Sequence, residues 1–249
     1  MGKPRSRENW ALAASLLESA LALDPQSVEA QSRLAGSLAG RVIDNMTDTA
    51  AADVSRAETL AEQALAASPQ SAVAHYAKGQ VLRAQHRYAE AIPEYEAVLA
   101  LDRNWVFAFF ALGQCKLHSG SIEETIPLVE QAIRLSPRDP VIGNFYNEIG
   151  RVHLLQSRSD DAITWLERAR NAVPSHAGTR GWLASAYALD GEIERAAAEL
   201  AEARRLSLDD RFASLTRLRA QGYWGVPKIR TLAETTYFAG LRKAGMPEE

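Results

Sequence analysis

The stretch that decides the fold is residues 71–103, SAVAHYAKGQVLRAQHRYAEAIPEYEAVLALDR. Its apolar residues recur every three to four positions on both sides of a short polar turn near residues 85–87, which is the spacing of an amphipathic helix. Alanine, the best helix former, is frequent, and runs of β-branched residues are absent. The stretch therefore predicts two helices, over 71–84 and 88–101, joined by a tight turn.

The turn after the second helix returns at regular intervals along the chain. The distances between successive turns are 44, 34, 34, 37 and 34 residues, so three of the five intervals are identical. A fixed period of this length is typical of repeat proteins that stack one helical unit on the next. The turns end at Pro25, Pro69, Arg103, Pro137, Pro174 and Leu208.

Small residues keep the same register as the turns. Helix axes approach closely only where side chains are small, and a glycine inside a helix costs about 1 kcal/mol relative to alanine. Recurrent small positions, three of them glycine, therefore indicate contacts between stacked helices. One column lies in the second helix of each unit, at Ala13, Ala57, Ala91, Thr125, Ala162 and Ala196, and another in the first, at Ala35, Gly79, Gly113, Gly150 and Ala184.

These columns, and the Gly79, Leu82, Tyr88, Ala91 and Tyr95 set of the opening stretch, resemble the tetratricopeptide repeat (TPR) family. The resemblance implies an all-α fold, a right-handed superhelix of about five and a half helix-turn-helix repeats with a C-terminal helical cap. We expect residues 1–7 to be disordered or left over from cloning, residues 8–208 to form the solenoid, and residues 209–249 to form capping helices and a tail.

The predicted helices can be placed from the apolar spacing and the turn residues. The second unit is ten residues longer than its neighbours, which indicates an insertion around residues 43–54 with a short loop over residues 46–48. This loop is an alternative binding surface to the groove described below. The thirteen expected helices lie near 8–23, 27–44, 51–67, 71–84, 88–101, 105–118, 122–135, 140–156, 159–172, 176–189, 193–206, 210–220 and 228–243.

Composition excludes several classes of function. The net charge of -3, without a basic stripe, argues against nucleic-acid binding. The single cysteine, Cys115, cannot form a disulfide within the chain, and we expect it to be an inert buried thiol. No apolar run is long enough to span a bilayer, so a cytoplasmic protein without a membrane partner is expected.

No motif for chemistry is present in the sequence. The five histidines lie in different repeats without metal-ligand spacing, and the acidic pairs stand at helix starts, where carboxylates interact favourably with the helix dipole. Nucleophile-elbow and phosphate-loop sequences are also absent. We therefore predict no catalytic residue, no metal and no cofactor, and a chain that is not an enzyme.

The TPR resemblance implies that the first helices of successive repeats line a groove for a partner. The residues expected on that groove mix aromatic rings, amides and arginines, which suits an extended peptide or a partner helix. For Tyr76, Phe110 and Arg151, packing between helices explains the residue equally well. The lysine and asparagine clamp by which some TPR domains hold a C-terminal carboxylate is absent. The predicted partner-binding residues are Tyr76, Gln80, Arg83, Phe110, Gln114, Asn147, Arg151 and Trp182.

The ending, residues 237–249, resembles the C-terminus of bacterial signalling proteins in which a TPR region follows an adenylate cyclase-like or winged-helix domain. This resemblance implies a fragment that regulates an N-terminal effector domain, either by binding a protein or peptide or by docking on that domain. The alternative is an architectural scaffold that self-assembles through the half repeat at residues 8–23, so a monomer or a weak homo-oligomer is expected. Tyr223 and Trp224 are expected to plug the last repeat, or else to form a binding patch.

Overall fold

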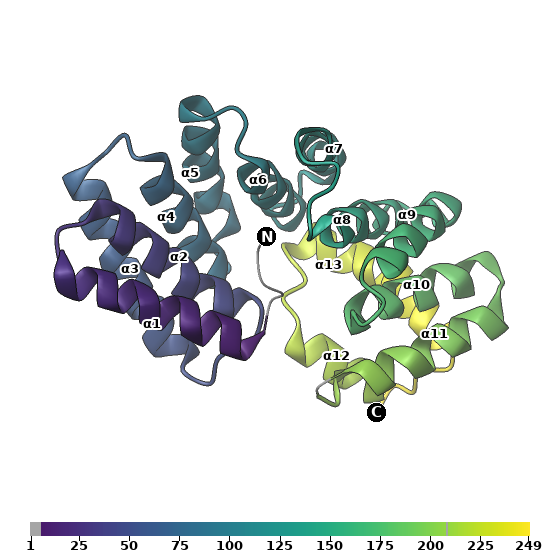
Figure 1. Cartoon of the computed structure of the whole chain (residues 1–249). Coiled ribbons are helices and arrows are strands. Elements are labelled where there is room, and N and C mark those ends of the chain that lie inside the picture. Colours follow the sequence, from purple (N-terminus) through teal and green to yellow (C-terminus); the bar gives the residue numbers. More distant parts are fainter. Residues whose placement is uncertain (1–5, 208) are drawn as a thin grey trace. The chain divides into compact units, whose positions relative to one another are not determined.

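The structure is a computed structural model that describes residues 6–207 and 209–249. All regular elements of these residues are helical, which confirms the predicted all-α fold (Figure 1). The chain forms two compact units, residues 1–115 (unit 1) and 116–249 (unit 2). The boundary falls inside α6 (Val106–His118).

Unit 1 consists of antiparallel helix pairs preceded by a single helix. Helix α2 packs against α3 and α4, and α4 packs against α5 (Figure 1). The side chains of Ser27 and Ser71 each accept a hydrogen bond from the backbone N–H three residues on, which fixes the start of α2 and of α4. The complete helices of unit 1 are α1 (Arg7–Leu23), α2 (Val28–Ile43), α3 (Ala50–Ala67), α4 (Ala72–Ala84) and α5 (Tyr88–Leu101).

Unit 2 continues the same pattern and ends in a group of shorter helices. Helix α8 packs against α9, and α10 packs against α9 and α11. Its elements after α6 are η1 (Ile122–Glu124), α7 (Thr125–Leu135), α8 (Ile142–Leu155), α9 (Ser159–Ala172), α10 (Ala177–Asp190), α11 (Ile193–Leu206), η2 (Arg211–Ala213), α12 (Leu215–Gln221), α13 (Pro227–Ala233), the π-helical η3 (Glu234–Phe238) and α14 (Ala239–Lys243).

Apart from Ala13, which is half-buried, the small-residue columns are buried, as predicted for helix contacts. Ala57, Ala91 and Ala162 are fully buried. A Cβ added to Gly79 would lie 2.7 Å from the ring of Tyr95. Such a contact is far inside van der Waals distance, so the helix pair α4 and α5 can approach this closely only with glycine at that position.

The turns between paired helices use a left-handed backbone conformation. Four of these turn residues have positive φ at matching places, 98° at Gly120, 91° at Gly191, 59° at His86 and 60° at Ser157. A left-handed residue after a helix is a common way to end it, usually with glycine. This conformation could not be predicted at His86 or Ser157, because glycine is its only strong signal in a sequence.

Most predicted helices agree with the structure within two residues. The helix expected over 122–135 instead begins with the 3-10 helix η1, which precedes α7. The helix expected over 210–220 divides into η2 and α12, and the one expected over 228–243 contains the π-helical turn η3. The first helix begins at Arg7, capped by the side chain of Ser6, one residue before the predicted start. Residues 1–5 of the N-terminal segment expected to be disordered lie outside the described residues.

The ten-residue insertion lengthens α2 and α3 and leaves a loop over residues 44–49. Asp53, which is buried, holds this loop in place. Its carboxylate accepts a hydrogen bond of 2.7 Å from Arg41 Nε and another of 2.7 Å from Thr47 Oγ1. The pKa of Asp53 is lowered, because these bonds to the charged form outweigh burial, which by itself raises it.

Candidate protein-binding surface

Four of the residues predicted to contact a partner form one hydrogen-bonded series in unit 1. Gln80 Nε2 donates to the hydroxyl of Tyr76 at 2.7 Å, and Arg83 Nη1 donates to Gln80 Oε1 at 2.8 Å. Arg83 Nη2 donates to Gln114 Oε1 on the next first helix, α6. The structure thus brings together side chains that are 31 positions apart in sequence.

Aromatic rings border this polar series. The ring of Tyr76 stacks on Trp105, with centroids 5.3 Å apart, and meets Tyr95 edge-on at 5.7 Å. Phe110 lies one helical turn before Gln114 and is largely buried. The ring of Tyr76 therefore packs between helices, which is one of the two roles considered from sequence, while its hydroxyl belongs to the polar series. Its role in partner binding stays a prediction. We name Tyr76, Gln80, Arg83, Phe110 and Gln114 the α4–α6 surface.

The remaining three predicted residues lie in unit 2, on α8 and α10. Arg151 Nη1 forms an ion pair of 2.9 Å with the buried Glu148, and its guanidinium lies 5.0 Å from the centre of the Trp182 ring. The amide oxygen of Asn147 accepts a hydrogen bond of 3.0 Å from Thr179 Oγ1. These contacts tie α8 to α10 within the unit.

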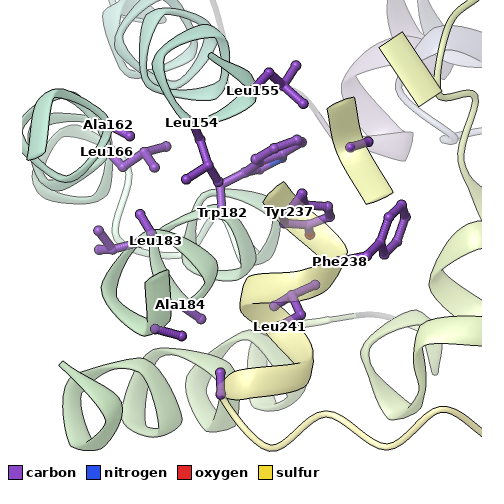
Figure 2. Packing of buried hydrophobic residues seen from close by; sticks show 14 of the residues in the cluster. Leu154, Leu155, Ala162, Leu166, Trp182, Leu183, Ala184, Tyr237, Phe238 and Leu241 are labelled. Atoms are coloured by element: carbon purple, nitrogen blue, oxygen red, sulfur yellow. The ribbon is translucent and has the colours of Figure 1, made fainter. Parts of the chain in front are cut away.

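Trp182, predicted as an open aromatic anchor, is buried at 6% exposure under the C-terminal helices. Its ring stacks on Tyr237 with centroids 3.8 Å apart (Figure 2). The ring of Trp224 lies 6.4 Å from that of Trp182. The prediction of an accessible Trp182 is therefore corrected. The reason is that a distant segment of the same chain buries its aromatic rings against this one.

The segment that covers Trp182 crosses the first helices of unit 2. The N–H of Val226 donates to the carbonyl of His118 at 3.0 Å, and Lys228 Nζ donates to the carbonyl of Gly120 at 2.9 Å. Further on, Ser185 Oγ donates to the carbonyl of Tyr237 at 2.9 Å. Helices α13, η3 and α14 thus lie along the end of α6, α8 and α10. We name Pro227–Lys243 the C-terminal strap.

Gly240 allows the close contact between the C-terminal strap and α10. A Cβ at this position would lie 2.2 Å from Ser185 Oγ and 2.5 Å from the carbonyl oxygen of the same residue. Any side chain there would push the two helices apart. Gly240 could not be singled out from the sequence alone, because its partner Ser185 lies more than fifty positions away.

The two aromatic residues before the strap differ in their surroundings. Trp224 packs edge-on against Phe238 at 4.8 Å, and its Nε1 donates to the carbonyl of Arg219 at 3.2 Å. Tyr223 is 37% exposed, with its ring 5.7 Å from that of His118. Trp224 is therefore a packing residue, while Tyr223 remains on the surface of unit 2.

The described residues offer no arrangement for a metal ion. Across residues 6–207 and 209–249, histidines, cysteine and carboxylates nowhere gather in groups of three that could hold one. His75, for example, pairs with Glu94 at 2.6 Å and with the carbonyl of Pro69 at 2.9 Å. No helix in this part of the chain has the length and apolar character needed to cross a membrane.

Paired helices with tight left-handed turns and small residues at their contacts define a helical-repeat protein. The profile of the Tetratricopeptide repeat family matches residues 50–105, 76–140, 110–177 and 147–210, so most of the chain is covered. The chain belongs to the tetratricopeptide repeat family. None of the curated proteins compared with it matches significantly.

Several solved structures share the fold. The peptide-binding TPR protein YrrB is 20% identical with a TM-score of 0.54, over 84% of this chain and 99% of its own. PilW, a type IV pilus biogenesis factor, is 19% identical with a TM-score of 0.63, over 80% and 86%. The Cut9–Hcn1 assembly of the APC/C is 17% identical with a TM-score of 0.66, over 96% of this chain and 46% of that one.

Proposed function

We propose that this chain is a non-catalytic protein-interaction module that binds a peptide or a partner protein on the α4–α6 surface. The observation that carries the proposal is the series from Tyr76 through Gln80 and Arg83 to Gln114. Amide and guanidinium groups on neighbouring first helices suit the main chain of an extended segment, and the bordering rings suit its side chains.

The C-terminal strap supports the choice of unit 1. In unit 2 the strap already covers the ring of Trp182 and lies across α8 and α10. A partner on that face would have to displace the buried rings of Tyr237 and Phe238. Each large aromatic side chain contributes several kcal/mol of burial free energy, so displacement is strongly unfavourable.

A relative in fold supports the kind of ligand. YrrB is described as a TPR protein with an unusual peptide-binding site. A sequence identity of 20% shows that the two proteins share a fold, and no more. The choice of a peptide ligand for this chain therefore rests on the amide groups of the α4–α6 surface and not on YrrB.

The experiment is a comparison of variants for binding to an array of randomised nine-residue peptides. We expect the double variant Gln80→Ala and Gln114→Ala to lose at least tenfold of the bound signal. The control is Gln63→Ala, an exposed amide on α3 in the same unit. Equal binding by wild type and the double variant, or no binding by any form, rejects the α4–α6 surface as the binding site.

Self-association through α1 is the second candidate function. Leu16 and Leu23 on this helix are 62% and 90% exposed, an apolar surface that a second copy could cover. Light scattering over a hundredfold range of concentration tests it. A mass that rises with concentration in wild type and stays constant in Leu16→Glu supports self-association, and a constant mass in both rejects it.

A regulatory role is a proposal that rests on the sequence resemblance of residues 237–249 to bacterial signalling proteins. In such a role, partner binding at the α4–α6 surface controls an attached effector domain in the cytoplasm. The test is co-expression of this chain with an adenylate cyclase-like domain and, separately, with a winged-helix domain. Cyclase activity or DNA binding that is unaffected by the chain rejects the role.

A further inference from the structure

Arg83 differs from the other shielded arginines of the chain. Four arginine side chains are between 17% and 25% exposed, and each forms an ion pair with a carboxylate. Arg83 is more deeply buried, at 9% exposure, yet no carboxylate among the described residues lies within ion-pair distance of it. The four paired arginines are Arg41, Arg151, Arg170 and Arg180.

The hydrogen bonds of Arg83 do not use all of its donors. A guanidinium has five N–H groups. Two of them donate to the amide oxygens of Gln80 and Gln114, and Nε is buried without a hydrogen-bond partner. The hydroxyl of Tyr95, also close to this guanidinium, is uncharged as well. Amide oxygens carry no charge and so leave the buried positive charge uncompensated, an unfavourable state that proteins usually avoid.

We propose that Arg83 is the anchor for a carboxylate supplied by the partner, the side chain of an internal aspartate or glutamate in an extended peptide. The proposal rests on the α4–α6 surface being the binding site. A carboxylate takes two N–H groups of a guanidinium at once and compensates its charge. Gln80 and Gln114 are half-buried side chains, and binding of the carboxylate requires that their amides exchange the hydrogen bonds with Arg83 for bonds to the peptide.

The position of Arg83 favours an internal acidic residue over a chain end. The polar series continues on both sides of Arg83, to Tyr76 along α4 and to Gln114 on α6. A peptide that continues past the acidic residue in both directions offers main-chain groups to both sides. A terminal carboxylate leaves one side of the series without a ligand.

The experiment compares three peptide pools in binding to the full chain. All pools are nine residues long, with eight positions randomised among uncharged residues. The first pool has glutamate at the centre and blocked ends, the second has glutamine at the centre and blocked ends, and the third has glutamine at the centre and a free C-terminal carboxylate. Binding is measured for wild type, Arg83→Gln and Arg83→Lys, with circular dichroism and melting curves to confirm the fold.

We expect wild type to bind the glutamate pool at least tenfold more tightly than either glutamine pool. Arg83→Gln should lose this preference while still binding peptide, and Arg83→Lys, which keeps the charge but not the two-pronged geometry, should retain part of it. A preference that survives in Arg83→Gln, or a preference for the free C-terminus, overturns the proposal.

Two further outcomes separate this inference from the proposed function. If all pools bind wild type equally and the double variant Gln80→Ala and Gln114→Ala abolishes binding, the α4–α6 surface is supported as the binding site. The role of Arg83 as a carboxylate anchor is then rejected. If none of the pools binds to wild type, both the surface and the carboxylate anchor are rejected.

Discussion

The rings of Trp182 and Tyr237 are stacked with their centroids 3.8 Å apart and their planes 21° from parallel. Fifty-five positions of sequence separate them, and the contact fixes the C-terminal strap on α10 (Figure 2). It decides which part of the chain is open to a partner, because it closes the first-helix face of unit 2 with a segment of the same molecule.

Replacing Tyr237 with alanine should destabilise the protein by about 3–5 kcal/mol, since it removes a fully packed ring and leaves a cavity against Trp182. Urea unfolding followed by tryptophan fluorescence measures this loss. The control is Tyr223→Ala, whose ring is partly exposed and close to the same segment. A similar loss in both variants would show that the strap is not held by the ring of Tyr237.

Two glycines in unit 1 offer a matched test of helix stacking. Gly79→Ala should lower the free energy of unfolding by about 1–3 kcal/mol, because the new methyl group overlaps the ring of Tyr95. Gly36→Ala, in the interior of α2 with open space around it, should instead raise it by up to about 1 kcal/mol through helix propensity. Chemical unfolding of both variants checks the signs, and equal effects would contradict the stacking.

The unpaired charge of Arg83 predicts an unusual response to mutation. Arg83→Met should leave the melting temperature unchanged or raise it, because it removes a buried charge that nothing compensates. Arg41→Met should cost about 3 kcal/mol, since it strands the buried carboxylate of Asp53. Differential scanning calorimetry compares the melting temperatures of the two variants. If Arg83→Met lowers the melting temperature as much as Arg41→Met does, Arg83 is a structural residue and the prediction is wrong.

Asp53 predicts a specific dependence of stability on pH. Its pKa in the folded protein lies below the ordinary value of 3.8, so the unfolded chain binds the proton more readily. Its contribution is therefore complete above about pH 5 and is lost as the pH falls through 3.8 towards the folded pKa. In urea unfolding from pH 6 to pH 2, the gap between wild type and Asp53→Asn should shrink, and a constant gap would contradict this.

Cys115 should not react with thiol reagents in the native protein. Burial raises its pKa to about 12, although the nearby charge of Arg83 acts in the opposite direction. Both the lack of thiolate and the lack of exposure oppose the reaction. Labelling with a chromogenic disulfide at pH 8 should proceed only in denaturant, and rapid labelling without denaturant would indicate that α6 opens readily.

The sequence by itself determined the repeating helices and their contacts. The predicted bounds of α4 and α5 agree with the structure within one residue, and Gly79 and Ala91 lie at helix contacts as predicted. Such features depend on apolar spacing, turn residues and side-chain size within one repeat or between neighbours. These short-range features can be predicted from a single sequence because the same pattern occurs in every repeat.

Only the tertiary structure decided which predicted site residues are accessible. Trp182 and Gln80 both stand on first helices, yet Trp182 is buried under the strap within unit 2, whereas Gln80 in unit 1 is half-buried. The missing counter-ion of Arg83 likewise depends on every element packed around it. The burial and the charge pairing of a side chain depend on contacts between segments far apart in the chain. A periodic sequence pattern does not predict these contacts.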